Sequence, residues 1–459
     1  MQVDLLVVGA GPAGMALATD AACMGLNVLV VDEQASHGGQ IYRAWERQSD
    51  GTLALMGPDY RRGGELVTAF RRQPLHYWPG TRVWAIESGF CVSLLRDGVA
   101  SQVRAERVAV CTGAMERAWP FAGWTLPGVV NGGGAQILLK EQGLMAEPAV
   151  LAGTGPLLYL LAWQYLQRGC APLAVVDLTP LRHYRRALAA LPKALRAGHY
   201  LWQGLRYQWA LKQARVPLYL GACRLAAEGD HWVRAVRFEH RGRKHHIDTD
   251  TLLTHFGVIP HTALSAGAGC PLDWSPQRLC WEPRQQDGRT PVPGLYVAGD
   301  GVAILGARQA AWRGRLLARE LARELNIQPV INEDEARQLQ ASMEQDAAIR
   351  PFLEALYRPD EQALAEEDDA TLLCRCEGIS LGRVRGLAAQ HNLDMNGLKA
   401  FSRCGMGPCQ GRQCGPQAAM VLAAKQGREV GELGVFTPRW PAAPLTLAQL
   451  ASLAEQEPD

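Results

Sequence analysis

The sequence shows no excess of charge of either sign. Its 459 residues include 47 lysines and arginines against 45 aspartates and glutamates, which gives a formal net charge of +2. A nucleic-acid or membrane-surface partner requires a clustered basic face. The overall charge balance therefore gives no support for either partner, and no nucleic acid is expected.

The sequence also lacks a secretory signal and an uninterrupted apolar segment. An apolar strand, residues 3–8, begins the chain without the basic region that starts a signal peptide. The longest apolar run, 149–166, contains Gly153, Gly155 and Pro156, and it fits a strand, a turn and a helix better than a membrane span. We expect a cytoplasmic protein without a transmembrane segment, with peripheral membrane association through a complex left open.

Cysteine is abundant, with 12 residues in the chain. Seven of the cysteines are scattered through mostly apolar surroundings, which is typical of buried structural thiols. The other five fall within 41 residues, 374–414. In a reducing compartment such a cluster indicates a metal site rather than disulfides.

Two segments of the chain begin in the same way, with a strand, a glycine-rich turn, a helix and a second strand. In the first segment the turn is 9–14 and the second strand ends at Asp32. In the second segment the turn is 153–156 and the second strand ends at Asp177. This internal repeat predicts an α/β fold with two Rossmann-like dinucleotide-binding domains.

A chain of this length holds about two to four domains. Residues 178–215 form a predicted amphipathic helical insertion that is rich in arginine and aromatic residues, and a partner-docking face is the alternative interpretation. Asn332, followed by three acids, predicts a helix N-terminus. The expected parts are a discontinuous first nucleotide-binding domain (1–120 and 257–326), a second, degenerate NAD-type domain (121–256), a helical acidic linker (327–370), a small α-rich cysteine domain (371–430) and a tail (431–459).

The first glycine-rich turn has the features of a dinucleotide-binding loop. Gly9 permits the tight turn, Gly11 allows the backbone to approach a pyrophosphate, and Gly14 lets the helix pack closely on the strand. The phosphates then meet free N–H groups at the helix N-terminus. Asp32 stands 23 positions after Gly9, where its carboxylate can accept hydrogen bonds from ribose hydroxyls.

Residues 1–326 resemble the two-dinucleotide-domain flavoprotein reductases. A strand that runs into 299–301 resembles their second FAD motif, and the segments 108–113, 38–40 and 256–260 resemble their linking strand, the loop beside the flavin phosphates and the return from the NAD-type domain. The resemblance implies FAD as the cofactor of the first domain. It implies contacts to FAD from Gly9, Gly11, Pro12, Ala13, Gly14, Asp32, Glu33, Gly39, Gln40, Val83, Thr112, Gly113, Gly299 and Asp300.

The second unit departs from the reductase pattern. Leu158 stands where the third glycine of the motif belongs, and its side chain would push the helix from the strand or fill the pyrophosphate approach. The pattern favours a degenerate or repurposed nucleotide pocket over one that uses NAD(P)H. No cysteine pair closely follows Gly39 or Cys111, which argues against the dithiol–disulfide chemistry of many such reductases.

Four cysteines have the spacing of an iron–sulfur site. Cys374 and Cys376 form a C-x-C pair, and 32 residues separate it from a C-x4-C pair, Cys409 and Cys414. Four thiolates can hold a [2Fe-2S] cluster. A structural zinc site is the alternative, but zinc pairs more often have the spacing C-x2–4-C. Neighbouring arginines and a helix that begins near Pro416 would suit an anionic cluster.

The segments 374–377 and 403–414 resemble the bacterioferritin-associated-ferredoxin-like module. That module occurs at the C-terminus of one subunit of opine oxidases, hydrogen cyanide synthase and related proline or hydroxyproline dehydrogenases, so the resemblance covers nearly the whole chain. It implies a [2Fe-2S] domain at 371–430. Its implied metal ligands are Cys374, Cys376, Cys409 and Cys414. Cys404 has the position of a bystander, and a ligand set with Cys404 in place of Cys414 stays open.

The resemblance implies an oxidoreductase acting on CH–NH or CH–NH2 donors within a multi-subunit complex. In that family a partner protein, a glycine- or amino-acid-oxidase-like flavoprotein, oxidises the substrate. The subunit similar to this chain conducts electrons through FAD and the cluster to an acceptor. Some relatives also hold an FMN between subunits or an adenine nucleotide in the second pocket, and a small third subunit is a further expectation.

The sequence offers no obvious general base near the flavin motifs, so the catalytic residues are unknown. His37, His255 and His261 are more typical of loop or core residues than of catalysts. Two alternatives to an electron-transfer subunit stay open. One is a self-sufficient NAD(P)H-dependent reductase, and the other is a non-catalytic iron-handling or scaffold protein.

Overall fold

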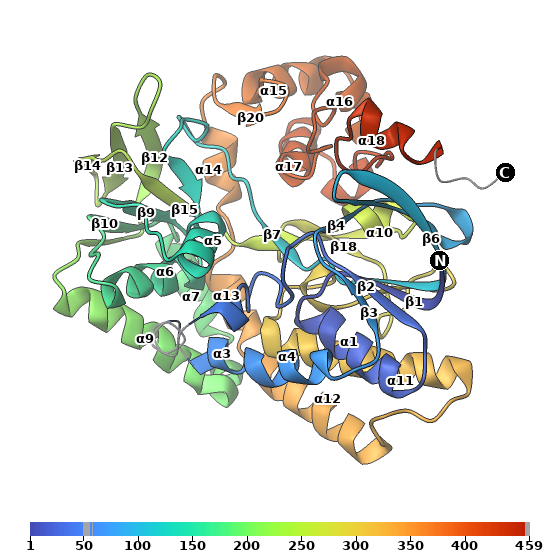
Figure 1. The fold of residues 1–459 in the computed structure, drawn as a ribbon. Coiled ribbons are helices and arrows are strands. Elements are labelled where there is room, and N and C mark those ends of the chain that lie inside the picture. Colours follow the sequence, from blue (N-terminus) through green and yellow to red (C-terminus); the bar gives the residue numbers. More distant parts are fainter. Residues whose placement is uncertain (49–55, 57, 455–459) are drawn as a thin grey trace.

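The computed structural model of the chain describes residues 1–48, 56 and 58–454. It contains two α/β units and a smaller, mainly helical C-terminal module that contacts both of them (Figure 1). The predicted fold class, an α/β architecture of the dinucleotide-binding reductase type with a small α-rich part, is confirmed.

The first unit is built on a seven-stranded sheet. Its strand β6 is long, so two other strands pair with different parts of the same edge of β6. Residues 99–104 of β6 pair with β5, and residues 108–110 pair with β19. All four residues of β2 are buried, as expected of a parallel strand covered on both faces. The strands are β1 (Gln2–Val8), β2 (Val28–Val31), β3 (His76–Trp78), β4 (Thr81–Ile86), β5 (Cys91–Arg96), β6 (Val99–Val110) and β19 (Leu295–Val297).

Helices α1 (Pro12–Cys23) and α11 (Ala307–Leu325) pack tightly against each other beside this sheet. They approach closely because small residues meet at the contact. A Cβ atom added to Gly314 would lie 2.3 Å from the carbonyl oxygen of Ala13 and 3.1 Å from Cβ of Ala16. The short helix α3 (Pro58–Arg61) and helix α4 (Gly63–Arg71) follow β2 in the chain, and α4 packs beside α1.

The second unit has a parallel five-stranded sheet in the order β11, β10, β9, β15, β8. The long apolar run 149–166 forms β9 (Val150–Gly153), a turn and most of α6 (Pro156–Gln167). Within the residues that the structure describes, no helix has both the length and the apolar character needed to cross a bilayer. The remaining elements are β8 (Val129–Asn131), α5 (Gly132–Gln142), β10 (Ala174–Asp177), β11 (Leu218–Leu220) and β15 (Leu252–His255).

Between β10 and β11 the chain forms three helices on the outside of the second unit (Figure 1). They are α7 (Leu181–Leu188), α8 (Leu191–Ala194) and α9 (Gly198–Gln213). Helix α9 packs on α6 through Tyr207 and Leu211, which are buried. An antiparallel sheet of β12 (Cys223–Glu228), β13 (Ala235–His240) and β14 (Arg243–Asp248) precedes β15.

The chain crosses between the two units twice, and the crossings pair as antiparallel strands β7 (Ala114–Glu116) and β16 (Val258–Pro260). The buried guanidinium of Arg117 fixes this junction. It donates hydrogen bonds to the carbonyl oxygens of Phe256, Arg278 and Leu279, at 3.2, 2.6 and 2.6 Å. Helix α10 (Ala263–Gly267) and a hairpin of β17 (Leu272–Ser275) and β18 (Cys280–Pro283) follow the return crossing.

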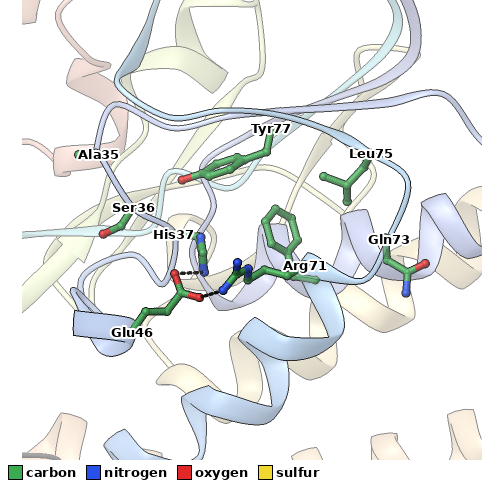
Figure 2. Close-up of a pocket in the computed structure, with 9 residues that line it drawn as sticks. Ala35, Ser36, His37, Glu46, Arg71, Gln73, Leu75 and Tyr77 are labelled. Atoms are coloured by element: carbon green, nitrogen blue, oxygen red, sulfur yellow. Dashed lines mark hydrogen bonds and ion pairs between the residues drawn. The ribbon is translucent and has the colours of Figure 1, made fainter. Parts of the chain in front are cut away.

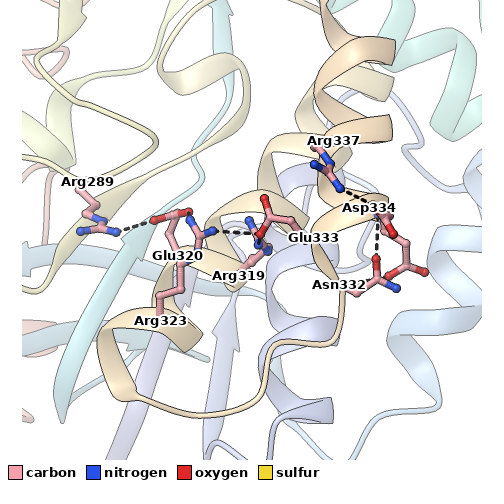
Figure 3. Close-up of polar contacts among 9 residues, drawn as sticks. Arg289, Arg319, Glu320, Arg323, Asn332, Glu333, Asp334 and Arg337 are labelled. Carbon is pink, nitrogen blue, oxygen red and sulfur yellow. Dashed lines mark hydrogen bonds and ion pairs between the residues drawn. The ribbon is translucent and has the colours of Figure 1, made fainter.

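Polar contacts attach the next helix, α12 (Glu333–Ala347), to α11 (Figure 3). The predicted N-terminus at Asn332 is confirmed as a capping box. The Asn332 side chain accepts the N–H of Glu335, and the Glu335 carboxylate accepts the N–H of Asn332, both at 2.9 Å. Arg319 of α11 forms an ion pair with Glu333. Helices α13 (Arg350–Leu356) and α14 (Glu361–Glu366) lead to the C-terminal module.

The C-terminal module shares one hydrophobic core with the second unit. Leu381, Leu398 and Leu422 of the module belong to the same buried cluster as Trp119 and Phe256. Such a continuous core resists separation, because undocking would expose apolar surface to water. The elements of the module are β20 (Leu372–Cys374), β21 (Ile379–Ser380), α15 (Leu381–Gln390), α16 (Met395–Ser402) and α17 (Gly415–Gln426).

The described part of the C-terminal tail, up to residue 454, runs from this module back to the first unit and contains α18 (Leu447–Ala451). The N–H of Ala442 donates to the carbonyl of Trp84 at 2.8 Å. The hydroxyl of Ser452 accepts the N–H of Ala100 at 2.9 Å. The module is therefore held on one side by the shared core and on the other by the tail.

The close contact between α1 and α11 leads to a prediction about the stability of the fold. We expect Gly314→Ala to destabilise the fold by about 1–3 kcal/mol, because the new methyl group meets the backbone of α1. Thermal unfolding measures the effect. The matched control is Gly204→Ala in α9, where an added Cβ meets nothing within 4 Å and the gain in helix propensity is roughly 0.5–1 kcal/mol. Equal melting temperatures for the two variants would contradict this packing.

Candidate functional site

The glycine-rich loop after β1 lies close to the start of α1 and to the loop that contains Gly39. A Cβ atom on Gly14 would lie 1.9 Å from the carbonyl oxygen of Gly9, so the start of α1 sits directly on the loop. A Cβ atom on Gly11 would meet nothing nearer than Gly39 Cα at 3.8 Å. Two glycine Cα atoms thus face each other, and a phosphate could approach both backbones. Pro12 and Ala13 form the first turn of α1.

Asp32 lies buried at the end of β2, directly beside this loop. Its carboxylate accepts the N–H groups of Ala10 at 2.6 Å and Gln34 at 2.7 Å. Burial raises the pKa of Asp32, and these two N–H donors oppose that shift. Each carboxylate oxygen keeps a further lone pair that can accept a ribose hydroxyl. The neighbouring side chain of Glu33 is exposed.

Lys140 supports the loop 38–41 from the second unit. Its buried ammonium donates to the carbonyl oxygens of Gln40 at 2.9 Å and Ile41 at 3.1 Å. Burial, with a further contribution from the charge of Arg43, lowers the pKa of Lys140 to about 7. The sequence analysis missed this residue, because the contact joins positions about a hundred residues apart and has no local signal.

Two further loops complete the FAD-type site, one after β6 and one after β19. A Cβ atom on Gly301 would lie 3.4 Å from the N and O atoms of Gly113, so the two loops touch. Asp300 accepts the N–H groups of Leu305 and Gly306 through Oδ1, at 3.0 and 3.1 Å. Its Oδ2 is therefore available to a cofactor hydroxyl. Gly299 packs against Ala13 of α1.

Val83 is placed differently from the other predicted FAD contacts. Its side chain is buried in the cluster that also contains Ile86, Val92 and Leu94. A contact with FAD would therefore have to come from its backbone. The rest of the predicted set lies on the four loops that follow β1, β2, β6 and β19 and in the first turn of α1.

Three cysteine thiols form a tight group in the C-terminal module. The sulfur atoms of Cys374, Cys404 and Cys414 lie within 4.8 Å of one another, and all three residues are buried. Cys404 and Cys414 are 3.8 Å apart. The structure thus brings Cys404 into one group with Cys374 and Cys414, which the local spacing did not indicate.

Cys376 and Cys409 form a second pair next to this group. Their thiols contact each other, and each also interacts electrostatically with a member of the buried group. Gly407 allows the approach, because a Cβ atom there would lie 2.3 Å from Cβ of Cys376. All four predicted ligands and Cys404 therefore converge on one site. Such a set of thiols suits iron–sulfur or zinc chemistry.

The thiol group already favours one thiolate. The Cys374 sulfur accepts hydrogen bonds from the thiols of Cys404 and Cys414 and from the N–H groups of Gly405 and Glu377, which hold the pKa of Cys374 well below its usual range. The same contacts raise the pKa of Cys404 and Cys414. Since metals bind the thiolate, Cys374 is prepared for ligation.

His261 lies between the FAD-type site and the cysteine site. Its N–H donates to the carbonyl of Gly113 at 2.9 Å, and its carbonyl accepts the hydroxyl of Thr112 at 2.9 Å. Burial and the positive charge of Arg412 lower the pKa of its imidazole. Arg412 in turn donates to the carbonyl of Cys409 at 3.0 Å. His261 beside the FAD-type loops and Arg412 in the cysteine loop are therefore close enough for the charge of Arg412 to act on the imidazole.

In the second unit, an imidazole occupies the place where a pyrophosphate would approach the turn 153–156. A Cβ atom on Gly155 would lie 2.9 Å from both Cδ2 and Nε2 of His255. His255 Nδ1 lies 3.0 Å from a carboxylate oxygen of Glu116, and Glu116 also accepts the N–H of Gly133 at 2.7 Å. Leu158 is buried in the core cluster beside Leu151. The sequence analysis missed the His255–Glu116 pair.

The acid at the end of β10 is also engaged by the protein itself. Asp177 is fully buried, it accepts a hydrogen bond from the hydroxyl of Tyr159, and it accepts the N–H of Thr179 at 2.8 Å. Burial raises the pKa of Asp177. A ribose would have to displace Tyr159 to reach this carboxylate. Both features support a degenerate second pocket.

Two cavities lie away from the predicted cofactor residues. One, of about 350 Å³, lies at the end of β2 and β3, where His37 Nε2 is 3.3 Å from Glu46 and Glu46 contacts Arg71 (Figure 2). Burial lowers the pKa of His37. The other, of about 390 Å³, lies between the β17–β18 hairpin and Glu354. Neither cavity is lined by a residue predicted to bind FAD or metal.

Comparison with known proteins places these sites in a family. Residues 3–315 match the model of the pyridine nucleotide-disulphide oxidoreductases, and residues 385–454 match the sarcosine oxidase A3 domain. The A subunit of opine oxidase from Agrobacterium tumefaciens (strain Ach5) is 38% identical over 98% of this chain and 92% of its own. The corresponding opine oxidase protein of Rhizobium meliloti is 37% identical over 98% of this chain and 87% of its own.

The chain belongs to the family of the opine oxidase A subunits. The predicted resemblance is thereby confirmed, and the chain is an oxidoreductase with a domain of the FAD-binding type. Hydrogen cyanide synthase subunit HcnB of Pseudomonas protegens, 30% identical over 97% of both chains, lies in the same group. The structure of L-proline dehydrogenase from P. horikoshii has the same fold, with a TM-score of 0.73 at 19% identity over 98% of this chain and 79% of that one.

The arrangement of the five cysteines leads to a prediction about which of them bind iron. We expect Cys374→Ser, Cys376→Ser, Cys409→Ser and Cys414→Ser each to lose most of the bound iron, because a [2Fe-2S] cluster needs four thiolates. Cys404→Ser should keep its iron. Iron content per chain and visible absorption provide the measurement, with Cys223→Ser, a change at an exposed cysteine, as the control. Iron loss in Cys404→Ser together with iron retention in Cys414→Ser would assign the other ligand set.

The position of the His255 imidazole beside Gly155 leads to a prediction about the affinity for NADH. We expect NADH to bind the wild-type chain weakly, and His255→Ala to strengthen that binding by roughly tenfold, because the pyrophosphate approach opens. Calorimetric titration with NADH measures both affinities. His246→Ala, a change at an exposed histidine of β14, is the control. Tight NADH binding by the wild-type chain, or an unchanged affinity in His255→Ala, would show that the imidazole does not close the pocket.

Proposed function

We propose that the chain is the electron-transfer subunit of a heteromeric amino-acid or opine dehydrogenase or oxidase. In this proposal, a partner flavoprotein subunit oxidises a CH–NH or CH–NH2 substrate. The chain conducts the electrons through FAD and a [2Fe-2S] cluster to an acceptor. The observation that carries the proposal is the position of His261, which contacts the end of β6 and also faces Arg412 of the cysteine loop.

The FAD assignment is supported by what the four loops offer. Gly11 and Gly39 carry no side chain that would keep phosphates from their backbones, the start of α1 supplies N–H groups, and Asp32 and Asp300 offer carboxylate oxygens to hydroxyls. Thr112 and Gly113 hold the end of β6 in place through His261. We assign the predicted FAD contacts to these loops on that basis.

The cluster assignment is supported by the donor set and its surroundings. Cys374, Cys376, Cys409 and Cys414 would hold the cluster, with Cys404 as a buried neighbour. The N–H groups of Gly405 and Glu377 point at the Cys374 sulfur, and such bonds stabilise negative charge on a thiolate. When bound, a flavin supplies two-electron and a [2Fe-2S] cluster one-electron chemistry.

A partner subunit is inferred because the second unit does not favour the binding of NAD(P)H. His255 lies against Gly155 and Asp177 is bound by Tyr159, so the pocket that would take NAD(P)H in a self-sufficient reductase is obstructed. Electrons are then supplied from another polypeptide. The relatives named above are subunits of opine oxidase and hydrogen cyanide synthase, and a glycine- or amino-acid-oxidase-like flavoprotein is the partner that this chemistry requires.

The test is a comparison of the chain alone with its complex. Co-expression with an amino-acid-oxidase-type flavoprotein encoded beside it should give a complex in which an amino acid or opine bleaches the absorbance of both the flavin and the cluster. The chain alone should respond neither to that substrate nor to NADH or NADPH.

The control is a complex that carries Cys414→Ser. In it, flavin bleaching should persist while electron delivery to a one-electron dye falls, because the cluster that passes single electrons is missing. Rapid bleaching of the isolated chain by NADH or NADPH would reject the proposed subunit role and favour the self-sufficient reductase.

A further inference from the structure

The helices inserted between β10 and β11 expose an unusual set of apolar side chains. Among the described residues, seven large apolar side chains are 60% or more exposed, and six of them lie between residues 181 and 209. The seventh is Leu447 in the tail. The six residues are Leu181, Leu188, Leu195, Trp202, Leu205 and Trp209, and we call the surface that they form on α7–α9 the α7–α9 face.

The packing of this segment is the reverse of an ordinary surface helix. Ala187, Ala194 and Ala197 are buried against the protein, whereas leucines next to them in sequence face solvent. In α9, Trp202 and Trp209 are separated by two helical turns and therefore lie on one side of the helix, 71% and 60% exposed. In α7 and α8, small residues inside and large apolar residues outside indicate that the outer surface is itself a contact surface.

Charge along the segment is of one sign. Residues 178–215 contain eight lysines and arginines and no acid, although the whole chain has a net charge of only +2. Arg182 is paired with Asp360, and Arg206 lies over the rings of Trp163 and Tyr207. Cations such as Arg185 and Lys193 are exposed, and no ion pair involving them occurs among the described residues. The apolar face is therefore bordered by positive charge.

The exposed apolar side chains and the positive charge together indicate what kind of partner binds the α7–α9 face. A second copy of the chain would bring the same cations together, so self-association is opposed by repulsion. A protein interface concentrates its apolar residues in a packed patch with charges of both signs at the rim. Leucine and tryptophan side chains that stand out along a helical segment, with cations and no acids in the segment itself, suit the boundary between lipid headgroups and acyl chains.

We propose that the α7–α9 face binds the surface of an anionic lipid bilayer. The leucines and tryptophans enter the headgroup–acyl boundary, and the flanking arginines and lysines contact anionic headgroups. The chain then lies on the membrane without a spanning helix. This surface is separate from the cofactor residues, so the inference does not depend on the proposed electron-transfer role.

The experiment is flotation of the full-length, cofactor-loaded chain with lipid vesicles. The wild-type chain should float with phosphatidylcholine vesicles that contain about 30% phosphatidylglycerol, and much less with pure phosphatidylcholine. Raising the salt from roughly 0.1 to 0.5 M should weaken binding, because the charges are screened. The double variant Trp202→Ala/Trp209→Ala should bind at least about tenfold more weakly, and Arg185→Gln/Arg186→Gln roughly fivefold or more.

Matched controls remove comparable groups elsewhere on the surface. Leu447→Ala removes an exposed apolar side chain, and Arg243→Gln/Lys244→Gln removes two exposed cations of β14. Both should bind vesicles like the wild type. The flavin absorbance of every variant should be unchanged, which separates a folding defect from loss of lipid binding.

Several outcomes would overturn the proposal. One is a wild-type chain that does not float with anionic vesicles. Another is a Trp202→Ala/Trp209→Ala variant that floats as well as the wild type. A change from dimer to monomer in that variant, measured by light scattering, would assign the face to a second copy. Loss of a co-purified subunit from the variant, with no vesicle binding by the wild type, would assign it to a protein partner.

Discussion

The hydrogen bonds between His261 and the end of β6 are the contact on which the arrangement of the two sites depends. The backbone of His261 is fixed to Thr112 and Gly113, where the FAD-type loops meet. Its ring lies close enough to Arg412 for that charge to lower its pKa. Because Arg412 belongs to the cysteine loop and donates to the carbonyl of Cys409, His261 links the FAD-type loops with the surroundings of the cysteine site.

The rest of the fold holds this junction in place. Arg117 locks the two crossings between the units through three backbone carbonyls. The cysteine module shares a hydrophobic core with the second unit, and the tail attaches it to the first unit through Ala442 and Ser452. The second unit therefore serves as a base for the module, and within it the His255 imidazole lies against Gly155 of the glycine-rich turn.

The parts of this architecture that depend on local chemistry could be predicted from the sequence. The spacing of Gly9, Gly11 and Gly14 specifies a strand, a tight turn and a helix, and Asn332 with Glu335 specifies a helix start. The family could be recognised from the order of such motifs. The C-x-C and C-x4-C pairs marked the cysteine site, and the fold brings one member of each, Cys374 and Cys414, together.

Long-range contacts could not be predicted in this way. Lys140 meets the loop 38–41 from about a hundred residues away, and His255 lies against Gly155 with the same separation. Cys404 looked like a bystander in the sequence, yet the fold brings its sulfur into the group with Cys374 and Cys414. Each of these positions depends on how segments far apart in the sequence pack, and no periodicity or motif within one segment records it.

The central claim is that one polypeptide holds both a flavin and an iron–sulfur cluster, close enough for electrons to pass between them. Metal and flavin analysis of the purified chain, followed by electron paramagnetic resonance after dithionite reduction, tests it most directly. The account predicts FAD, iron and acid-labile sulfide in the same protein, with the rhombic signal of a reduced [2Fe-2S] cluster. Zinc in place of iron, with no such signal, would contradict it.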